Sequence, residues 1–348
     1  MQQAVIECVP NISEGRNSRV IDKIVNSVQQ SEECSVLSVE PDKDYNRTVV
    51  TIAGSPEAVY QAAYQIIQSS IELIDMEQHE GEHPRLGVVD VCPFIPLSHY
   101  SMEDCAQLAK RLAKQVAADF EAPTFLYGYA ASNPERKLLS ALRKGEYEGL
   151  KSRMDGTDEI HQEATRLPDY GPQEWNNTVQ KSGGITIGAR DILVAYNVNV
   201  NEVDARVAKK VGSIIRGSGR LIKSSTGEKM RIRGMIEQIQ GMGVVLEEHS
   251  ISQVSMNILD VNKCPIHMAF EICRSIASDH GIDLLGSELV GLVPLSAMLE
   301  TGRWFSDKTD PSEEELVDFA INGLGLSTLN EFNPFNRIIE WALRREQQ

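Results

Sequence analysis

His83 lies in the stretch "GEHPRLGVVDVCPFIPL" (Gly81–Leu97), followed by a proline and then by a long apolar run. Pro84 disfavours helical geometry at the preceding residue, so His83 is expected on a loop. An imidazole with a pKa of about 6.5 can accept or release a proton at neutral pH. Catalytic groups concentrate on loops held by a rigid sheet. The stretch therefore predicts a general base or acid; a structural turn histidine is the alternative.

His79 precedes His83 by four residues, the spacing of two metal ligands on one helix face. That arrangement requires a helix, and Gly81 and Pro84 interrupt one. We therefore expect no metal at this pair.

Two arginines are candidates for binding carboxylates: Arg85, beside the histidine, and Arg47 in "DYNRTVV". A guanidinium can hold a carboxylate through two parallel hydrogen bonds. The stretch "CVPNISEGR" ends an expected strand with Asn11, a short polar residue suited to the polar edge of a ligand, although an Asx turn or a helix cap explains it nearly as well. The alternative for the arginines is surface ion pairing with their acidic neighbours, Glu80, Glu82, Asp42 or Asp44.

The elements that must position these residues form two series in a chain of 348 residues, a length that favours two domains. In the first half, apolar periodicity predicts strands at 4–9, 35–40, 48–53, 88–97 and 124–130 and helices near 18–30, 56–73, 102–118 and 134–142. In the second half it predicts strands near 191–200, 244–247, 252–259 and 284–293 and helices near 203–216 and 265–278.

Each series reads βαββαβ, and their ends are alike in sequence. "GVVDVCPFIPL" and "GSELVGLVPL" both run from a glycine through an apolar strand to a Pro-Leu helix entry. We infer an α/β (α+β) fold of two tandem ferredoxin-like βαββαβ subdomains with a ligand cleft between them. Asp310-Pro311 and Asn333-Pro334 are expected to start two closing helices. The expected divisions are 1–182, 183–302 and a helical tail, 303–348.

Composition narrows the function. The formal net charge of −16 argues against a general nucleic-acid binder or an anionic-membrane binder, so small-molecule partners are expected. No apolar run approaches the roughly 18 residues of a membrane span, and the N-terminus lacks a secretory signal, which indicates a cytoplasmic protein. The six cysteines form no CxxC pair and mostly lie in apolar segments, as reduced core thiols do.

One segment reverses the local sign of charge. Residues 205–235 contain nine basic residues and one acidic residue. Such a segment can steer an anionic ligand, or it can be a flexible solvated loop. It lacks the spacing of a phosphate-binding loop, as does "GGITIGAR".

Several longer stretches together resemble one family. "ECVPNISEGR", "NRTVVTIAGSPEAV", "LIDMEQHEGEHPRLGVVDVCPFIPL", "ALRKGEYEGL", "PDYG", "QVSMNILD" and "GSELVGLVPLSAML" are similar to glutamate formimidoyltransferase (formiminotransferase) sequences from Glu7 to Trp341. In the bifunctional form of this family a cyclodeaminase domain follows, whereas this chain stops at Gln348. The sequence is therefore expected to represent a monofunctional form, corresponding to the transferase half alone.

The resemblance implies transfer of the formimidoyl group from N-formimidoyl-L-glutamate to N5 of tetrahydrofolate, a step of histidine degradation, by a homodimer. We expect the reaction to need no metal. It implies that His83 is the catalytic base and that folate lies between the two subdomains. Arg47, Arg85, Asn11 and Glu40 are the expected substrate-binding residues, Glu40 standing where an aspartate is expected. The segment Gly171–Gly184 is expected to contact folate through Gly171, Pro172, Gln173, Glu174, Trp175, Gly183 and Gly184.

Two alternatives stay open. The same scaffold could use another one-carbon donor, such as N-formylglutamate or 5-formyltetrahydrofolate, because the sequence does not separate =NH from =O at the transferred carbon. A folate-binding protein without turnover is the other.

Overall fold

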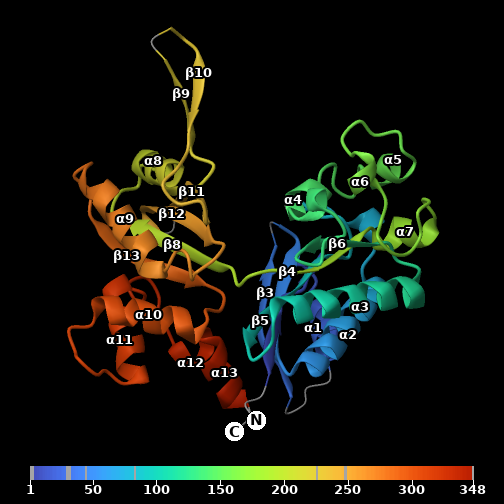
Figure 1. Cartoon of the computed structure of the whole chain (residues 1–348), viewed down its shortest axis with the longest axis horizontal. Coiled ribbons are helices and arrows are strands. Elements are labelled where there is room, and N and C mark those ends of the chain that lie inside the picture. Colours follow the sequence, from blue (N-terminus) through green and yellow to red (C-terminus); the bar gives the residue numbers. More distant parts are fainter. Residues whose placement is uncertain are drawn as a thin grey trace. The chain divides into compact units, whose positions relative to one another are not determined.

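The computed structural model describes residues 4–28, 33–43, 45–81, 84–224, 226–246 and 249–346. The chain forms two compact units that divide between Asp191 and Ile192 (Figure 1). Each unit is a mixed α/β structure, as the sequence predicts, and each is described by itself below.

The first unit contains the predicted βαββαβ series. The first two strands of the unit are two short segments of one interrupted central strand. Both segments pair antiparallel with the fourth strand on one side and with the fifth strand on the other, and the third strand pairs antiparallel with the fourth. The resulting order, β3–β4–β1/β2–β5, is that of a ferredoxin-like sheet. The elements are β1 (Val5–Cys8), β2 (Asn11–Ile12), α1 (Ser18–Asn26), β3 (Cys34–Asp42), β4 (Arg47–Gly54), α2 (Pro56–Leu73) and β5 (Val89–Ser98).

The first sheet continues beyond β5 with two parallel strands. The strand β6 (Thr124–Gly128) follows α3 (Met102–Phe120) in the chain. In the sheet, β7 (Ile185–Ala189) lies between β5 and β6 and is parallel to both. The expected strands do not include β7, because its five residues are all buried and such a short apolar run has no period typical of a strand. The expected division after residue 182 falls before this strand. Because β7 is hydrogen-bonded inside this sheet, the first unit extends to Asp191.

Short helices fill the connection between β6 and β7. They are η2 (Pro134–Arg136), α4 (Leu139–Leu142), α5 (Leu150–Met154), α6 (Glu163–Arg166) and α7 (Asn177–Ser182), and the 3-10 turn η1 (Met76–Gln78) precedes the His83 segment. The main core lies between the sheet and helices α1, α2 and α3, where residues such as Ile52, Ile66 and Leu112 are fully buried. Hydrophobic burial on this face holds the sheet rigid beneath the loops at its ends.

The second unit repeats the first topology. Its sheet has the order β11–β12–β8–β13 with every neighbouring pair antiparallel, which confirms the predicted duplication. The elements are β8 (Val194–Val200), α8 (Arg206–Ile215), β11 (Ile239–Leu246), β12 (Ile251–Ile258), α9 (Ile266–Ser278) and β13 (Leu284–Val290).

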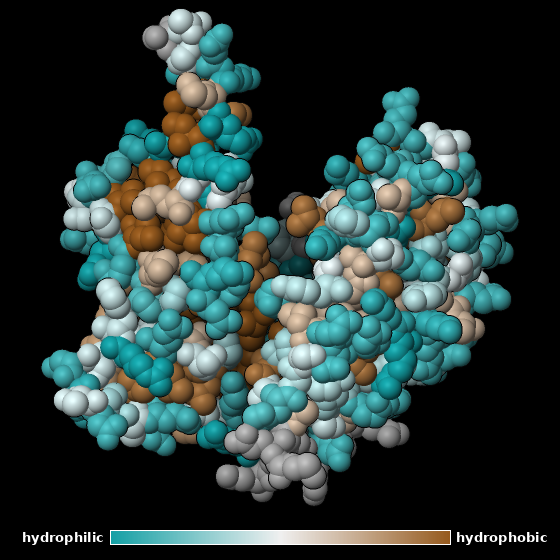
Figure 2. All heavy atoms as spheres, viewed as in Figure 1, coloured by the Kyte–Doolittle hydropathy of each residue, from teal (hydrophilic) through white to brown (hydrophobic). Residues whose placement is uncertain are grey.

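A two-stranded ribbon interrupts this second series. The strands β9 (Arg220–Lys223) and β10 (Lys229–Ile232) pair antiparallel and project from the rest of the unit (Figure 1). The basic segment is therefore partly ordered as a β-hairpin and is not simply a flexible loop. Its exposed side chains include Leu221 and Met230, and hydrophobic residues are visible along the ribbon in Figure 2.

The C-terminal helices belong to the core of the second unit. They are α10 (Leu295–Phe305), α11 (Glu313–Leu324), α12 (Pro334–Arg337) and α13 (Ile339–Glu346). Ile338 and Trp341 are buried among the sheet and helix residues of this unit. Asn333 caps α12 as predicted, whereas α11 starts two residues later than expected, at a capping box between Ser312 and Glu315.

All six cysteines are buried and free, which confirms the prediction of core thiols. None of the helices in the described ranges is both long and apolar enough to cross a membrane.

Candidate active site

Asn46 joins three loops at one end of the first sheet. Its side-chain carbonyl accepts from the Gly15 backbone N–H at 2.9 Å, and its Nδ2 donates to the Glu80 carbonyl at 2.9 Å. Its backbone has φ +48°, a left-handed conformation that asparagine tolerates better than most residues. The loops around Gly15, Asn46 and Glu80 therefore have a shared, buried anchor.

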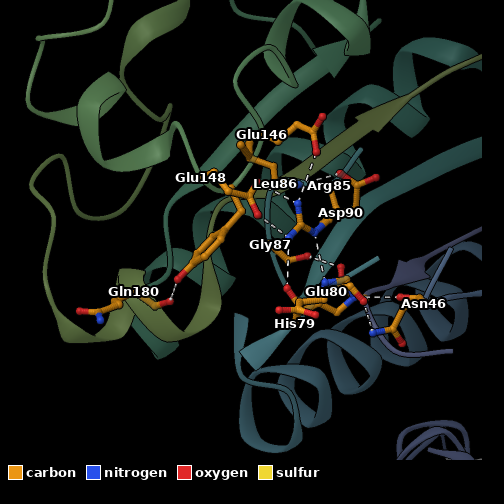
Figure 3. Close-up of polar contacts among 12 residues, drawn as sticks. Asn46, His79, Glu80, Arg85, Leu86, Gly87, Asp90, Glu146, Glu148 and Gln180 are labelled. Atoms are coloured by element: carbon orange, nitrogen blue, oxygen red, sulfur yellow. Dashed lines mark hydrogen bonds and ion pairs between the residues drawn. The ribbon is translucent and has the colours of Figure 1, made fainter. Parts of the chain in front are cut away.

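His79 is held by hydrogen bonds at both ring nitrogens (Figure 3). The Arg85 Nε donates to its Nδ1 at 3.1 Å, so the ring proton lies on Nε2, which donates to the Asn46 carbonyl at 2.9 Å. Burial lowers the pKa of His79, and the charge on Arg85 adds to that shift, so the neutral ring is favoured. His79 is a neutral structural link in this arrangement.

Arg85 is buried and bound by a short acidic turn. Its guanidinium donates to Glu148 at 2.6 and 2.9 Å and to Glu146 at 3.3 Å, and its Nη2 also reaches the His79 carbonyl at 3.2 Å (Figure 3). Among the described residues, the ion pairs of Arg85 are with these two glutamates and not with its sequence neighbours. All three guanidinium nitrogens are engaged by the protein itself.

The same turn reaches the neighbouring α7. The Tyr147 backbone N–H donates to the Arg85 carbonyl at 2.9 Å, and its hydroxyl donates to the Gln180 carbonyl at 2.5 Å. The turn in "KGEYEGL" therefore holds Arg85 through hydrogen bonds to both its guanidinium and its backbone carbonyl.

Asp90 is a buried carboxylate below this loop. It is 1% exposed, and it accepts from the Leu86 backbone N–H at 3.1 Å and from the Arg143 Nε at 3.1 Å, with a second Arg143 contact at Nη2. Burial raises the pKa of Asp90, and Arg143 and the hydrogen bonds offset part of that shift. The Leu86–Asp90 hydrogen bond fixes the chain after His83 to the start of β5, and the ion pair with Arg143 ties the same carboxylate to the end of α4.

A narrow crevice brings these residues together with Arg47. It is lined by Ser13, Tyr45, Asn46, Arg47, His79, Arg85 and Asp90. Burial lowers the pKa of Arg47, and Asp90 opposes that shift. The structure therefore unites the predicted Arg47 and Arg85 at one crevice.

Asn11 and Glu40 lie on the sheet beside Arg47. Both are paired directly with Val49 of β4, from opposite sides, so they share one face with each other and with Arg47, two residues from Val49. The Asn11 amide donates to the Val9 carbonyl at 2.9 Å, and Glu40 accepts from the Ser38 hydroxyl at 3.1 Å. These three predicted residues lie on the sheet face opposite helices α1, α2 and α3.

His83 and Glu82 lie outside the described residues, as does Asp44. The flanking chain is closely packed: a Cβ on Gly81 would stand 2.4 Å from the Tyr45 carbonyl oxygen, and Arg85 follows two residues after His83. The described part of the chain holds no group of three or more potential metal ligands. Because both nitrogens of His79 are already hydrogen-bonded, a metal on His79 would require breaking these contacts.

The predicted folate segment separates into two environments. Gly171, Gln173 and Glu174 are exposed, Pro172 is half-buried, and Trp175 packs beside Tyr147 with ring centroids 6.2 Å apart. Gly183 and Gly184 are instead buried. The Gly184 N–H donates to the Leu86 carbonyl at 2.9 Å, and Gly183, at φ +62°, ends α7 where a Cβ would meet the backbone of Leu86 and Gly87.

Sequence reasoning missed the residues that hold the loop, namely Asn46, His79 in this role, Asp90, Arg143, Glu146 and Glu148. One signal was available. Asp90 is the single charge in the apolar run 88–97, and a lone carboxylate in a buried strand requires a partner. Nothing in the sequence says that the partner is Arg143, 53 residues away.

An open depression adjoins the crevice and shares Asn46 with it. Arg16, Asn17, Ser18 and Arg19 at the start of α1 line it together with Glu14. Two arginines and a helix N-terminus give this surface a local preference for anions.

Comparison with known families agrees with this geometry. Residues 5–190 match the N-terminal subdomain of the formiminotransferase domain, and residues 195–344 match the formiminotransferase domain. The chain belongs to the formiminotransferase family. The two matched ranges correspond to the two compact units.

Named relatives fall into two groups. The chain is 34% identical to glutamate formimidoyltransferase of Streptococcus pyogenes and 36% identical to that of Thermoplasma acidophilum, with 88% and 87% of this chain and 94% and 92% of those proteins covered. It is 38% identical to formimidoyltransferase-cyclodeaminase of Mus musculus over 97% of this chain, and it spans 60% of the length of that relative.

Proposed function

We propose that this protein is a glutamate formimidoyltransferase that moves the formimidoyl group of N-formimidoyl-L-glutamate to N5 of tetrahydrofolate, with His83 as general base. The observation that carries the proposal is the fixed chain on either side of position 83. Asn46 and His79 hold the residues before it, and the Arg85–Glu148 ion pair and the Leu86–Asp90 hydrogen bond hold the residues after it. The two relatives named glutamate formimidoyltransferase, at 34% and 36% identity, support the same reaction.

The reaction joins the formimidoyl carbon to N5 and breaks the bond between that carbon and the glutamate nitrogen. N5 loses one proton, and the departing nitrogen gains one. A positioned base that accepts the N5 proton allows the tetrahedral adduct to expel glutamate, and such catalysis typically supplies about 10²–10⁴-fold in rate. His83 is the residue we assign to that proton, because its neighbour His79 is occupied at both nitrogens.

The donor carries two carboxylates, and the surroundings of the crevice supply cations. Arg47 lines the crevice, and Arg16 and Arg19 line the adjoining depression. We assign Arg47 to a donor carboxylate, with Asn11 and Glu40 as polar neighbours on the same sheet face. Arg85 is better suited to positioning the loop than to binding substrate, because Glu146, Glu148 and His79 already accept from its guanidinium.

Tetrahydrofolate is the co-substrate in this proposal. The exposed loop Gly171–Trp175 offers it accessible groups, whereas the buried Gly183 and Gly184 suit a backbone-packing role. We further propose that the reaction serves histidine degradation and that the protein works as a cytoplasmic homodimer.

A coupled assay tests the reaction directly. Purified protein is supplied with tetrahydrofolate and either N-formimidoyl-L-glutamate or N-formyl-L-glutamate, and formation of the N5-substituted folate and of free glutamate is measured. We expect turnover with the formimidoyl donor. Preference for the formyl donor would assign the alternative one-carbon reaction, and folate binding without turnover of either donor would contradict an enzymatic role.

A further inference from the structure

The loop between α5 and α6 contains a buried acid–histidine pair that the proposed chemistry does not use. The side chains of His161 and Asp158 are 2% and 8% exposed, and the His161 Nδ1 lies 2.5 Å from an Asp158 carboxylate oxygen. Because a carboxylate accepts, the proton of the neutral ring lies on Nδ1. The ring Nε2 and the other Asp158 oxygen, Oδ1, are buried and have no hydrogen-bond partner among the described residues.

The surroundings of His161 favour the neutral ring. Burial lowers its pKa, the hydrogen bond to Asp158 opposes that shift, and the charges of Arg153 in α5 and Lys144 in the KGEYEGL turn (144–150) add to it. Proton uptake would create an N–H group at Nε2, where the described residues offer no acceptor. A buried donor without an acceptor and a buried charge are both costly, so protonation should displace the ring.

The guanidinium of Arg153 connects the chain before the KGEYEGL turn with the chain after the His161 loop. Arg153 is 1% exposed, and it donates to the backbone carbonyls of Leu142 at 2.6 Å, of Arg166 at 2.9 Å and of Thr165. Leu142 ends α4, and Thr165 and Arg166 belong to α6. One buried side chain therefore fixes the His161 loop and the entry to the turn to each other.

His161 also packs against the KGEYEGL turn itself. A Cβ on Gly145 would lie 4.0 Å from the His161 Cε1, which is ordinary van der Waals contact. Gly145 has φ +78°, and its carbonyl accepts from the Gly149 N–H at 2.7 Å, which closes the turn. Between these glycines, Glu148 accepts from the Arg85 guanidinium at 2.6 and 2.9 Å (Figure 3). Contacts thus run from His161 through the turn to Arg85, two residues after position 83.

We propose that His161 is a positioning residue for the transfer reaction: the neutral Asp158–His161 pair holds the KGEYEGL turn in the shape that fixes Arg85, and proton uptake by His161 loosens it. This proposal rests on the proposed function for the reaction that it affects. It gives a buried histidine outside the crevice an acid-sensitive hold on the chain after position 83.

Steady-state kinetics of two variants at neutral pH tests the positioning role. His161→Leu removes the donor to Asp158, and we expect kcat to fall about tenfold while the KM for N-formimidoyl-L-glutamate stays nearly unchanged, because the reacting groups are misplaced and the binding groups remain. His161→Asn has an amide that can donate to Asp158 from the place of Nδ1, and it should keep kcat within about twofold of the wild type.

The pH dependence of kcat tests the proton uptake. The kcat of His161→Asn divided by that of the wild type should rise toward about tenfold as pH falls below the ordinary histidine pKa of about 6.5, because asparagine does not titrate. This ratio cancels the titration of His79 and His83, which both proteins share. The matched control is His267→Asn, a half-buried histidine of the second unit whose pKa burial also lowers, and its ratio should stay constant.

Hydrogen exchange at a fixed pH reports on the turn without any activity. The Tyr147 amide, which donates to the Arg85 carbonyl, should exchange faster in His161→Leu and at the wild-type rate in His161→Asn. If thermal unfolding shows that His161→Leu does not fold, the pH ratio of His161→Asn decides the question. A constant ratio, or an unchanged kcat in folded His161→Leu, would overturn the proposal. Faster exchange in His161→Leu without transfer activity in the wild type defeats the proposed function and keeps the hold of His161 on the turn.

Discussion

The two units have one strand order and two different chemistries. In the first, the polar end of the sheet is built from arginines and carboxylates, with Asp90 and Arg143 paired in the interior. In the second, the corresponding face is built from carboxamides around Asn199 and Gln253. The apolar faces are alike because both must bury helices, so the topology constrains the core and leaves the opposite face free to specialise. The comparison indicates that the two copies of a duplicated fold can carry different polar side chains on the same topology.

The largest effect should follow from removing the proposed base in the first unit. We expect His83→Ala to lower kcat by about 10²–10⁴-fold while folate affinity changes much less, because proton transfer is lost and the binding groups remain. Steady-state kinetics with both substrates measures the split. His280→Ala, an exposed histidine of the second unit, is the control, and an unchanged kcat in folded His83→Ala would remove this residue from the mechanism.

Breaking the Asp90–Arg143 ion pair should lower the free energy of unfolding more than removing the hydrogen bonds of Gln253. Asp90→Leu leaves the Arg143 charge without its partner, at a cost of about 3 kcal/mol in the free energy of unfolding. Gln253→Leu in the second unit removes one hydrogen bond to an amide oxygen and one to the Glu288 carboxylate but breaks no ion pair, so it should cost about 1–2 kcal/mol. Urea unfolding compares them, with Asp90→Leu/Arg143→Met expected to recover part of the loss. Equal losses of unfolding free energy in Asp90→Leu and Gln253→Leu would contradict this expectation.

Kinetics of Arg85 variants can separate a positioning role for this residue from a substrate-binding role. If it positions the His83 loop, Arg85→Lys should lower kcat about tenfold and leave the KM for the formimidoyl donor nearly unchanged, since a lysine cannot reproduce the two-pronged contact with Glu148. Glu148→Gln should produce the same pattern because it weakens the same brace. A selective rise in the donor KM for Arg85→Lys would instead show that Arg85 binds substrate.

Most of the fold could be read from the sequence because its strands and helices have clean hydrophobic periods. The predicted helix at 56–73 matches α2 residue for residue, and the repeated βαββαβ order is present in both units. The missed strand β7 shows the limit. Its five residues are all buried, and such a short apolar run has no period that separates a strand from other buried segments.

The candidate site could be predicted only in part from the sequence, because the partners of its residues are distant along the chain. Arg47 and Arg85 stood out by type and by their place near strand ends, and both line the crevice. Their partners are set by long-range packing: Glu148 reaches Arg85 across 63 positions of sequence. No local pattern encodes such a distance. Among the described residues the alternative of an ion pair with a sequence neighbour is not seen for Arg85, whose ion pairs are with Glu146 and Glu148.

Acid should destabilise the protein through His79. Because burial lowers its pKa below the ordinary value of about 6.5, the unfolded chain takes up the proton first as pH falls. Stability from this group is fully present above about pH 6.5 and is lost as pH falls through the folded-state pKa, by at most about 1.4 kcal/mol per pH unit.

A difference measurement isolates this residue. His161 and His267 also have lowered pKa values from burial, so the wild type alone reports all three. The unfolding free energy of His79→Gln, subtracted from that of the wild type between pH 5 and 8, should show a gap that shrinks on acidification. A gap independent of pH would contradict the assignment of a neutral His79.

The smallest effect we expect concerns the basic ribbon, which has no counterpart among the described residues of the first unit. Lys223 and Lys229 are directly opposite each other across β9 and β10, and Arg231 is opposite Leu221. Like charges in a cross-strand pair are destabilising, so an anion near them relieves the repulsion. The glutamate chain that cellular folates carry is such an anion. Arg216, which the sequence analysis grouped with these cations, is instead committed to backbone carbonyls at the base of the ribbon.

Neutralising Arg220, Lys223 and Lys229 together to glutamine should raise the KM for pentaglutamyl tetrahydrofolate about threefold at low salt and leave the monoglutamyl KM nearly unchanged. This rise in KM should become smaller at high salt, because exposed contacts of this kind are screened within about 10 Å at 0.1 M ionic strength. The matched control neutralises three exposed cations elsewhere, Lys23, Lys114 and Arg303. If both triple variants lose affinity equally for the two folates, the effect is one of net charge, and the ribbon has no particular role in holding the tail.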